Sequence, residues 1–424
     1  MSSIQIEPIK QPLRGHVVLP LSKSISNRQL VLGAHTYQPF EVIGVSEAQD
    51  TRYLIEALRQ CGYSVEDTGG VFRFLPPQNF PPFLNLFLGE GGTTLRFLLP
   101  WLVRYPGKVK VEVAPSLQKR PLLPLLASLQ KAGAIIHSTA ALFPLEIEGN
   151  PDWRPKTLEI DSTLSSQFIS ALLLSAPGLE VGTCIVEKGL FSATPSYRQI
   201  TIALLAQQGY LWEQQGNQWI LQSKGTPPHT FQGEADWSAS SFFWGWAALG
   251  RFEGTLTLSS HTLQPEKNLF PMLPLPYTYS WESPTLLYLR SLPYPISPLD
   301  ADLTDYPDAF PALSVVAAFA EGISHLRGTQ TLPHKETNRL EAIKAELSKL
   351  GAKVSHQGNT LLIYPASHLP SPPLTFQSYG DHRMAMALSL VAARLPFSFS
   401  IQTPECVRKS FPQYWQLLEN LRNS

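Results

Sequence analysis

Four segments of the chain end in the same way, and this repetition is the feature that most constrains the fold. Each segment places a leucine four residues before a glycine, and residues that favour a strand follow. A glycine there accepts the left-handed conformation that ends a helix, so each segment predicts a helix followed directly by a strand. The segments are LRQCGYSV from Leu58, LQKAGAII from Leu129, LAQQGYLW from Leu205 and LSKLGAKV from Leu347.

The spacing of these glycines predicts how many units the chain contains. Gly62 and Gly133 are 71 residues apart, Gly133 and Gly209 are 76 apart, and Gly209 and Gly351 are 142 apart, which is twice 71. A fifth unit is expected near residue 280, where LPLPYTYSW has lost the glycine but kept the strand-like tail. About six repeated α/β units therefore fill the 424 residues. Two domains of three units each fit this length better than an open solenoid, because the connections are irregular and rich in proline.

Charge and cysteine usage exclude several classes of protein. Lys plus Arg and Asp plus Glu each number 33, so the chain lacks the excess of cations that drives binding to nucleic acid. No window approaches 18 uninterrupted apolar residues, and the N-terminal MSSIQIEPIKQPLRG lacks the apolar segment of a signal peptide. Cys61, Cys184 and Cys406 match no metal or redox spacing. We therefore expect a monomeric cytoplasmic protein with reduced thiols, no metal and no membrane partner.

Cations and small polar residues gather where apolar helices are expected to begin. In SKSISNR (22–28), Lys23 and Arg28 stand among serines just before an apolar run. Serines can cap the first N–H groups of a helix, and those groups together with two cations suit a phosphate. From this stretch alone, a capped helix with two solvated cations is at least as good an interpretation.

Six further stretches repeat this arrangement, and each has a plain structural alternative. Asp308 can be an N-cap, Glu336 and Arg339 can pair on a helix surface, and His382 can be a structural histidine. Each charge-assisted hydrogen bond to phosphate or carboxylate contributes about 1.5–3 kcal/mol, so the set as a whole predicts a ligand with several anionic groups. The stretches are GGTTLR (91–96), Lys119–Arg120, Ser165–Gln167, Asp308, Lys335–Arg339 with Asp381–Arg383, and Arg408–Lys409.

Taken in order, these stretches resemble the EPSP synthase (3-phosphoshikimate 1-carboxyvinyltransferase) branch of the enolpyruvyl transferases. The resemblance implies an inside-out α/β barrel fold of six βαβαββ repeats, three in each of two domains, with the active site in the interdomain cleft. It also implies that one domain comprises 1–20 plus 235–424 and the other 21–234. The stretches that carry it are SKSISNR (22–28), DTR (50–52), GGTTLRF (91–97), KRP (119–121), SSQ (165–167), DWSAS (236–240), PDAFPAL (307–313), HKETNR (334–339), DHRMAMAL (381–388) and KSFPQYW (409–415).

The resemblance further implies a reaction without metal or organic cofactor, in which the enolpyruvyl group of phosphoenolpyruvate moves to the 5-hydroxyl of shikimate 3-phosphate. Asp308 is the expected base and Glu336 the expected acid, while Lys23 and Lys409 polarise the leaving phosphate. Residues implied for shikimate 3-phosphate are Lys23, Ser24, Arg28, Ser165, Ser166, Gln167, Thr194, Tyr197, Asp308 and Lys335. Residues implied for phosphoenolpyruvate are Lys23, Gly92, Arg120, Gln167, Arg339, His382, Arg383 and Lys409.

Some positions depart from the family pattern. In FSATPSY (191–197) the usual serine is displaced, so Ser192, Thr194 and Ser196 remain alternatives. Glu90 adds a negative charge to the glycine loop, and Thr331 stands where an asparagine is common.

Two other functions are weighed against this one. A UDP-N-acetylglucosamine carboxyvinyltransferase would carry a cysteine in the loop that reads APSLQKRP here. A non-catalytic protein that binds phosphorylated metabolites would have no need of an acid–base pair.

Overall fold

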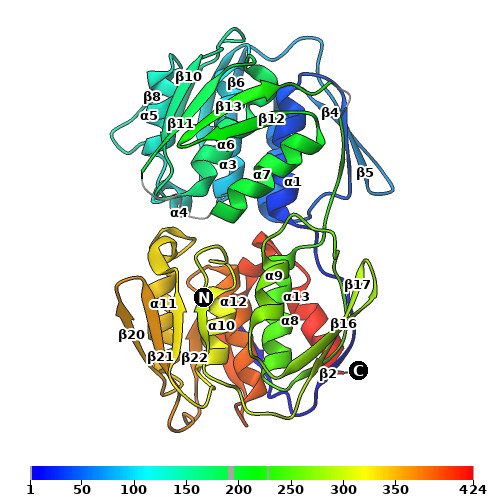
Figure 1. Cartoon of the computed structure of the whole chain (residues 1–424), viewed down its shortest axis with the longest axis vertical. Helices are drawn as coiled ribbons and strands as arrows, with labels where there is room; N and C mark the ends of the chain where they lie inside the picture. The colour runs from blue at the N-terminus through cyan, green and yellow to red at the C-terminus, as the bar shows by residue number, and fades with distance from the viewer. Residues whose placement is uncertain (1, 190–194, 227–228, 424) are drawn as a thin grey trace. The chain divides into compact units, whose positions relative to one another are not determined.

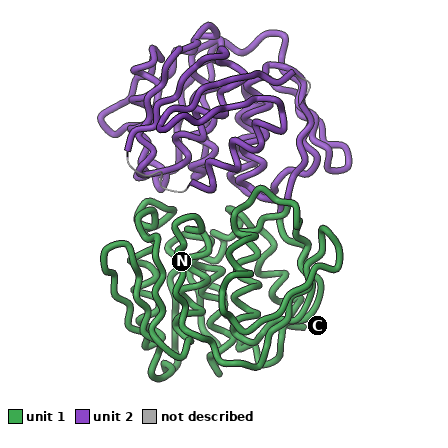
Figure 2. Tube along the Cα trace, in the orientation of Figure 1, with its two compact units in different colours: residues 1–20, 235–424 green, residues 21–234 purple. Residues whose placement is uncertain are grey.

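The computed structural model describes residues 2–189, 195–226 and 229–423. It divides into two compact units, shown in two colours in Figure 2. Unit 1 comprises Met1–Pro20 and Ala235–Ser424, and unit 2 comprises Leu21–Glu234. The chain therefore leaves unit 1 after its first 20 residues and returns to it at residue 235.

Two repeats of unit 2 run without interruption in the order βαβαββ. In each, the first two strands are parallel, and the last two form a hairpin that joins the second strand antiparallel. One repeat consists of β6 (Phe83–Phe87), α3 (Gly92–Val103), β7 (Lys108–Glu112), the short α4 (Pro115–Gln118), α5 (Leu123–Lys131), β8 (Ile135–Ser138) and β9 (Leu145–Glu148). The next consists of β10 (Thr157–Asp161), α6 (Ser166–Leu174), β11 (Cys184–Lys188), α7 (Pro195–Gln207), β12 (Leu211–Gln215) and β13 (Gln218–Ser223).

The third repeat of unit 2 is closed by a strand from the far end of the unit. It begins at a helix, and its missing first strand, β14 (His229–Gln232), pairs parallel with β3 so that Phe40 lies opposite His229. The remaining elements are α1 (Lys23–His35), β3 (Phe40–Ile43), α2 (Gln49–Gln60), β4 (Ser64–Thr68) and β5 (Val71–Leu75).

Unit 1 has the same plan, with one repeat interrupted and one closed by the N-terminus. The whole of unit 2 is inserted between β2 (Leu13–Val17) and α8 (Trp237–Ala248), yet β2 still pairs parallel with β15. The rest of that repeat is β15 (Phe252–Thr257), α9 (Glu266–Met272), β16 (Tyr277–Ser283) and β17 (Leu286–Ser291). The next is β18 (Asp300–Asp302), α10 (Phe310–Ala317), β19 (Ser324–Arg327), α11 (Arg339–Ser348), β20 (Lys353–Gln357) and β21 (Thr360–Tyr364).

The last repeat has a three-stranded sheet. Its N-terminal strand β1 (Ser3–Ile6) pairs antiparallel with β23, and β22 pairs parallel with it. The elements are β22 (Thr375–Gln377), α12 (His382–Ser389), β23 (Phe399–Gln402) and α13 (Tyr414–Arg422). Short 3₁₀ turns occur at η1 (Ala176–Gly178), η2 (Thr329–His334), η3 (Leu390–Ala393) and η4 (Pro404–Lys409). Six small mixed sheets thus confirm an α/β fold of six repeats.

The glycines that defined the period end helices as predicted. Gly62, Gly133, Gly209 and Gly351 all have positive φ, between 81° and 98°. Each follows a helix, and a single residue separates it from the strand that comes next: β4, β8, β12 and β20, respectively. The fifth unit expected near residue 280 is α9 followed by β16.

In each unit, three helices are almost wholly buried. In unit 2 these are α1, α3 and α6, and in unit 1 they are α8, α10 and α12 (Figure 1). Each is the first helix of its repeat; α1, α3 and α6 pack on one another, and α10 packs on both α8 and α12. A helix buried on all sides can be apolar or small all round, which explains runs such as FISALLL in α6. Its N-terminus is then the natural place for polar residues.

The described helices include no candidate membrane span. None of those within residues 2–189, 195–226 and 229–423 combines the length and hydropathy that a span requires.

Candidate active site

Three helix starts in unit 1 bring six charged residues together. α10, α11 and α12 pack on one another. Asp308 lies two residues before α10, Arg339 is the first residue of α11, and Asp381 is the N-cap of α12. We call the group the unit 1 cluster; its members are Asp308, Lys335, Glu336, Arg339, Asp381 and Arg383.

Arg339 is the centre of this cluster and is wholly buried. Its Nε donates to Asp381 Oδ2 at 2.8 Å, its Nη1 to Asp308 Oδ1 at 2.8 Å, and its Nη2 to Glu336 Oε2 at 2.9 Å. Burial alone would lower the pKa of Arg339, but Asp381, Glu336 and Asp308 outweigh it and raise the pKa. This guanidinium is therefore always charged, and it holds three carboxylates in fixed positions.

Asp308 is the member of the cluster that reaches the most cations. Arg383 Nη2 lies 3.0 Å from its Oδ2, and Lys335 Nζ lies 3.6 Å from its Oδ1, the oxygen that also accepts from Arg339. Burial would raise the pKa of Asp308, but Arg383, Lys335 and Arg339 together hold it well below its usual range. The group is therefore an ionised acceptor, and its side chain is 17% exposed, enough to meet a ligand.

The structure decides between two alternatives raised by the sequence. Asp308 is not an N-cap, because Ala309 holds that position of α10 and the carboxylate is taken by cations from other segments. Glu336 and Arg339 do pair, but not on a helix surface, because Glu336 precedes α11 and Arg339 is buried.

Asp381 was not predicted as a site residue. Its side chain caps α12 by accepting from the N–H of Arg383 at 2.9 Å, and it also binds Arg339. The sequence indicates Asp381 only as an Asp directly before the apolar helix in DHRMAMAL, and N-capping alone explains an Asp at that position.

Two further predicted residues of unit 1 lie near this cluster in the fold. His382 is buried on the first turn of α12, with Nδ1 3.9 Å from Asp381 Oδ1. Lys409 is buried at the end of η4, which packs on α12. The expectation that Arg408 and Lys409 stand at the entrance of an apolar helix is wrong. α13 begins only at Tyr414, because Ser410 leaves helical geometry with φ −145°.

In unit 2, Lys23 opens α1 and binds an acid that was not predicted. Its Nζ donates to Asp50 Oδ2 at 2.8 Å, and Asp50 is buried on the first turn of α2. The carbonyl of Asp50 accepts from the hydroxyl of Thr94 on the first turn of α3, at 2.8 Å. The stretch DTR had flagged Asp50 only as part of the family pattern.

The prediction that serines cap α1 is wrong at its N-cap position. Among the described residues, the side chain of Ser22 accepts no capping hydrogen bond. The hydroxyl of Ser26 instead accepts from the N–H of Ser46, a tertiary contact that the local sequence does not reveal.

Arg28 is buried on α1, and each of its nitrogens donates to a neutral oxygen. Nε donates to the Thr201 hydroxyl at 2.8 Å, Nη1 to the Ser24 carbonyl at 2.7 Å, and Nη2 to the Tyr197 carbonyl at 3.0 Å. The guanidinium also lies over the ring of Phe97, 4.9 Å from its centroid. Burial, opposed weakly by Tyr197, lowers the pKa of Arg28 to about 10.

Gly92 and Arg120 lie against each other. A Cβ on Gly92 would lie 3.0 Å from both terminal nitrogens of Arg120, so the absence of a side chain lets the guanidinium rest on the start of α3. Glu90, two residues earlier, is exposed.

Arg96 on α3 joins two predicted site segments, although it was itself not predicted to bind a substrate. It donates to Gln167 Oε1 at 2.7 Å and to the carbonyl of Pro121, the residue after Arg120, at 2.5 Å. Arg96 therefore fixes the side chain of Gln167 relative to the loop that carries Arg120. Its position in the middle of a buried helix was the signal that a sequence reading could have used.

The remaining predicted residues lie at the starts of α6 and α7. Ser165 caps α6 by accepting from the N–H of Gln167 at 3.3 Å, and Ser166 is buried beside it. Ser196 and Tyr197 lie on the first turn of α7. Ser192 and Thr194 fall outside the described residues.

Both groups of residues suit anionic ligands. Guanidinium and ammonium groups bind phosphate and carboxylate, with bidentate geometry available to arginine. Among residues 2–189, 195–226 and 229–423, no three His, Cys, Asp or Glu side chains are placed to hold a metal ion. The three carboxylates of the unit 1 cluster are instead bound to cations of the chain itself.

The sequence matches a known family over most of its length. The model of the family described as EPSP synthase (3-phosphoshikimate 1-carboxyvinyltransferase) matches residues 8–418. A 3-phosphoshikimate 1-carboxyvinyltransferase of Photobacterium profundum is 32% identical over 442 residues, covering 99% of each chain. One of Syntrophobacter fumaroxidans is 32% identical over 430 residues, again covering 99% of each.

Solved structures share the fold. An EPSP synthase from Acinetobacter baumannii superposes with a TM-score of 0.77 at 23% identity, covering 99% of this chain and 98% of that one. The enolpyruvyl transferase NikO from Streptomyces tendae gives a TM-score of 0.76 at 16% identity, covering 99% and 97%.

Proposed function

The chain belongs to the EPSP synthase (3-phosphoshikimate 1-carboxyvinyltransferase) family, and we propose that it carries out the family reaction with the unit 1 cluster and the cations of unit 2. The reaction joins the carboxyvinyl group of phosphoenolpyruvate to the 5-hydroxyl of shikimate 3-phosphate and releases phosphate. The observation that carries the proposal is the meeting of Asp308, Glu336, Lys335 and Arg383 around the buried guanidinium of Arg339. Both an acid–base pair and anion-binding groups are then present in one small cluster.

Asp308 is assigned as the base that accepts the proton of the 5-hydroxyl. In the free protein its pKa lies well below the usual range, which makes it a weak base. Anionic substrates compete for Arg383 and Lys335, the cations that hold this pKa down. Substrate binding therefore raises the basicity of Asp308 at the moment when the hydroxyl must lose its proton.

Glu336 is assigned as the acid that protonates the methylene carbon of phosphoenolpyruvate. The 5-oxygen then bonds to the adjacent carbon and gives a tetrahedral ketal. Loss of a proton from the new methyl group and of phosphate from the ketal completes the transfer. The pair with Arg339 at 2.9 Å favours the ionised form of Glu336, so this assignment requires that the pair loosen when substrates bind.

The remaining cations are assigned to the anionic groups of the two substrates. Arg120 and Arg383 have forked donors that match the phosphate and carboxylate of phosphoenolpyruvate. Arg28, Ser165 and Ser166 are assigned to shikimate 3-phosphate with Lys335, while Lys23 and Lys409 stabilise the departing phosphate. Gln167, held by Arg96, is assigned to both substrates.

The test is phosphate release by the purified protein with both substrates and with each omitted in turn. Release that requires both substrates supports the proposal. Binding of shikimate 3-phosphate without release would favour the non-catalytic alternative. Release with UDP-N-acetylglucosamine in place of shikimate 3-phosphate would favour the other transferase.

A further inference from the structure

Helix α11 binds the segment that leads into α12 at two places. At the first residue of α11, Arg339 binds Asp381, the N-cap of α12. Seven residues later, Glu346 binds Gln377 and Tyr379, which lie shortly before that N-cap. Residues seven apart lie on one face of a helix, about 10 Å apart along its axis, so both contacts come from the same side of α11. The roles assigned above use only the first contact.

Glu346 is a wholly buried carboxylate that joins the end of α11 to β22 and to the turn after it. Its Oε1 accepts from the hydroxyl of Tyr379 at 2.7 Å, and its Oε2 accepts from the N–H of Gln377 at 2.9 Å. The ammonium of Lys349 donates to Oε2 at 2.6 Å and to the carbonyl of Thr375 on β22 at 3.0 Å. A carboxylate that accepts from a cation and two further donors is held in one position.

The turn from β22 to α12, residues 378–380, contains a residue in an unfavourable backbone conformation. Tyr379 has a φ of 56°, in the left-handed region that a tyrosine rarely adopts. Its side chain is partly exposed, and its hydroxyl is bound to Glu346. Such conformations persist where the surrounding structure fixes them, and they are common next to active sites.

The same turn is also held at its first residue. The hydroxyls of Ser378 and Thr403 hydrogen-bond to each other, and the N–H of Gly380 donates to Ser378 Oγ at 3.2 Å. The carbonyl of Ser378 accepts from the N–H of Asp381 at 2.9 Å. Thr403, with a φ of 53°, is the N-cap of η4, which ends at Lys409. The turn is therefore bound to α11 through one residue and to η4 through another.

The start of α12 follows the position of this turn. Arg383 lies two residues after the N-cap, and its Nη2 is 3.0 Å from Asp308 Oδ2. A shift of the turn would move Asp381 and Arg383 together relative to Arg339 and Asp308. A misplacement of about 1 Å in an active site can lower a rate about 100-fold, so the position of the turn matters for the reaction.

We propose that Tyr379 and Glu346 are positioning residues of the carboxyvinyl transfer. The hydrogen bond between them fixes the turn, and the turn fixes the start of α12, which carries Arg383, against the rest of the unit 1 cluster. Neither residue has to contact a substrate in this role. The inference rests on the proposed function, in which Arg383 binds phosphoenolpyruvate.

Phosphate release by Tyr379→Phe, measured over a range of each substrate, tests the proposal. The variant keeps the ring but removes the hydroxyl that binds Glu346. We expect kcat/KM for phosphoenolpyruvate to fall about tenfold or more, with a higher KM. The dissociation constant of shikimate 3-phosphate, measured by calorimetry, should stay within about threefold, because most residues assigned to it lie in unit 2. A purely structural role would lower the thermal midpoint and leave the KM for phosphoenolpyruvate unchanged.

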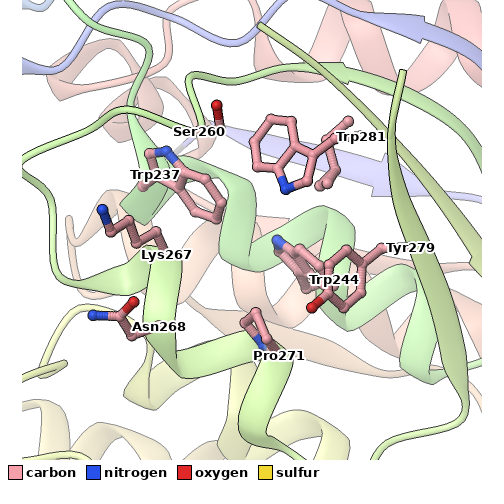
Figure 3. A pocket seen from close by; sticks show the side chains of 9 residues that line it. Trp237, Trp244, Ser260, Lys267, Asn268, Pro271, Tyr279 and Trp281 are labelled. Atoms are coloured by element: carbon pink, nitrogen blue, oxygen red, sulfur yellow. The ribbon is translucent and has the colours of Figure 1, made fainter. Parts of the chain in front are cut away.

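Two further variants show what the effect depends on. Tyr379→Gly suits the left-handed backbone but also removes the hydroxyl, so it should lose at least as much as Tyr379→Phe. Tyr288→Phe is the matched control, because the Tyr288 hydroxyl also donates to a glutamate, Glu253, at 3.0 Å. Tyr288 belongs to the repeat that forms the aromatic cavity of Figure 3, whereas the unit 1 cluster comes from the other two repeats of unit 1. Tyr288→Phe should therefore keep the wild-type kinetics.

Losses in both Tyr379 variants, with normal kinetics in Tyr288→Phe, support the inference. It is overturned if Tyr379→Phe keeps the wild-type kcat and KM, if Tyr379→Gly restores them, or if Tyr288→Phe loses as much. It is also overturned if the affinity for shikimate 3-phosphate falls as far as that for phosphoenolpyruvate. In each of these cases the active wild-type protein still supports the proposed function. A wild-type protein that releases no phosphate would instead overturn the proposed function, and this inference with it.

Discussion

The two units handle charge in opposite ways. In the unit 1 cluster three carboxylates meet three cations, so the formal charges cancel within the cluster. In unit 2, four cations and the acid that binds Lys23 belong to predicted anion-binding stretches or contact them. That group, which we call the unit 2 set, comprises Lys23, Arg28, Asp50, Arg96 and Arg120.

Two buried arginines show what the difference means. Arg339 in unit 1 is bound to three carboxylates, and its pKa is raised despite burial. Arg28 in unit 2 is bound to neutral oxygens, and burial lowers its pKa to about 10. The hydrogen-bond acceptors of Arg28 thus carry no charge that balances its own, so Arg28 favours an incoming anion. The charge of Arg339 instead holds three carboxylates in position. This contrast supports the proposal that unit 2 attracts the anionic substrates and that unit 1 holds the proposed catalytic carboxylates in place.

Removing Arg339 should have the largest effect. Arg339→Met leaves Asp308, Glu336 and Asp381 buried without their shared partner, and it should lower the free energy of unfolding by about 3–5 kcal/mol. Arg96→Met in unit 2 removes hydrogen bonds to two neutral acceptors, Gln167 Oε1 and the Pro121 carbonyl, and should cost about 1–3 kcal/mol. Urea denaturation measures both.

Lys344→Met is the control for this measurement. It removes an exposed pair with Glu341 on the same helix and should cost about 0.5 kcal/mol or less. If Arg96→Met destabilises the protein more than Arg339→Met, the proposed contrast between the units is wrong.

Replacing Asp308 by asparagine should affect turnover more than binding. Asp308→Asn keeps the shape of the side chain but removes the base, so kcat should fall about 10²–10⁴-fold. Dissociation constants for both substrates should stay within about threefold, since no cation is lost. Phosphate release and calorimetry measure the two quantities. Asp300→Asn, at an exposed carboxylate of the same repeat, is the matched control, and near-normal turnover in Asp308→Asn would remove it from the mechanism.

The sequence predicts the repeats well because their ends are locally determined. A helix that stops at a left-handed glycine leaves the same mark wherever it occurs, and all four glycines have positive φ. The local sequence does not indicate which strands complete the interrupted repeats. β2 and β14 pair with strands about 240 and 190 residues away along the chain, and only tertiary packing selects those partners.

The site divides in the same way. Helix entrances rich in cations can be recognised locally, and most of the candidate site residues are predicted from them. Asp50 and Asp381 were missed because their partners, Lys23 and Arg339, lie on other helices. The structural alternative for Asp308, an N-cap, is wrong for the same reason, since cations from other segments bind its carboxylate.

A change in the unit 2 set should separate the two substrates. Arg120→Ala should raise the dissociation constant of phosphoenolpyruvate about 10–100-fold, because one charge-assisted contact is lost. Shikimate 3-phosphate binding should change less than about threefold. Calorimetry with each substrate measures both, and Lys119→Ala at the exposed neighbouring position controls for general charge. Equal losses for the two substrates would refute the assignment.

Gly92→Ala should reproduce part of the Arg120 effect without removing a charge. The added methyl group would meet the Arg120 guanidinium at 3.0 Å, so the side chain must shift away from the start of α3. We expect KM for phosphoenolpyruvate to rise about threefold to tenfold, with an unchanged thermal midpoint. In an Arg120→Ala background the same substitution should add almost nothing, because the two act through one contact. Additive effects in the double variant would contradict this mechanism.

The smallest effect expected is the dependence of stability on acid pH that Asp308 of unit 1 provides. The pKa of Asp308 lies well below its usual value in the folded protein, so its ionised form stabilises the fold at every pH above the unfolded value of about 4. That contribution is lost as the pH falls through the lower folded value. The free energy of unfolding of wild-type protein relative to Asp308→Asn should therefore be constant between pH 5 and 8 and shrink below about pH 4. Arg28, with a pKa of about 10, stays charged throughout this range and adds no acid dependence. Urea titrations of both proteins from pH 3 to pH 8 measure the difference, and one that grows on acidification would mean that the cations of unit 1 do not hold Asp308 as a carboxylate.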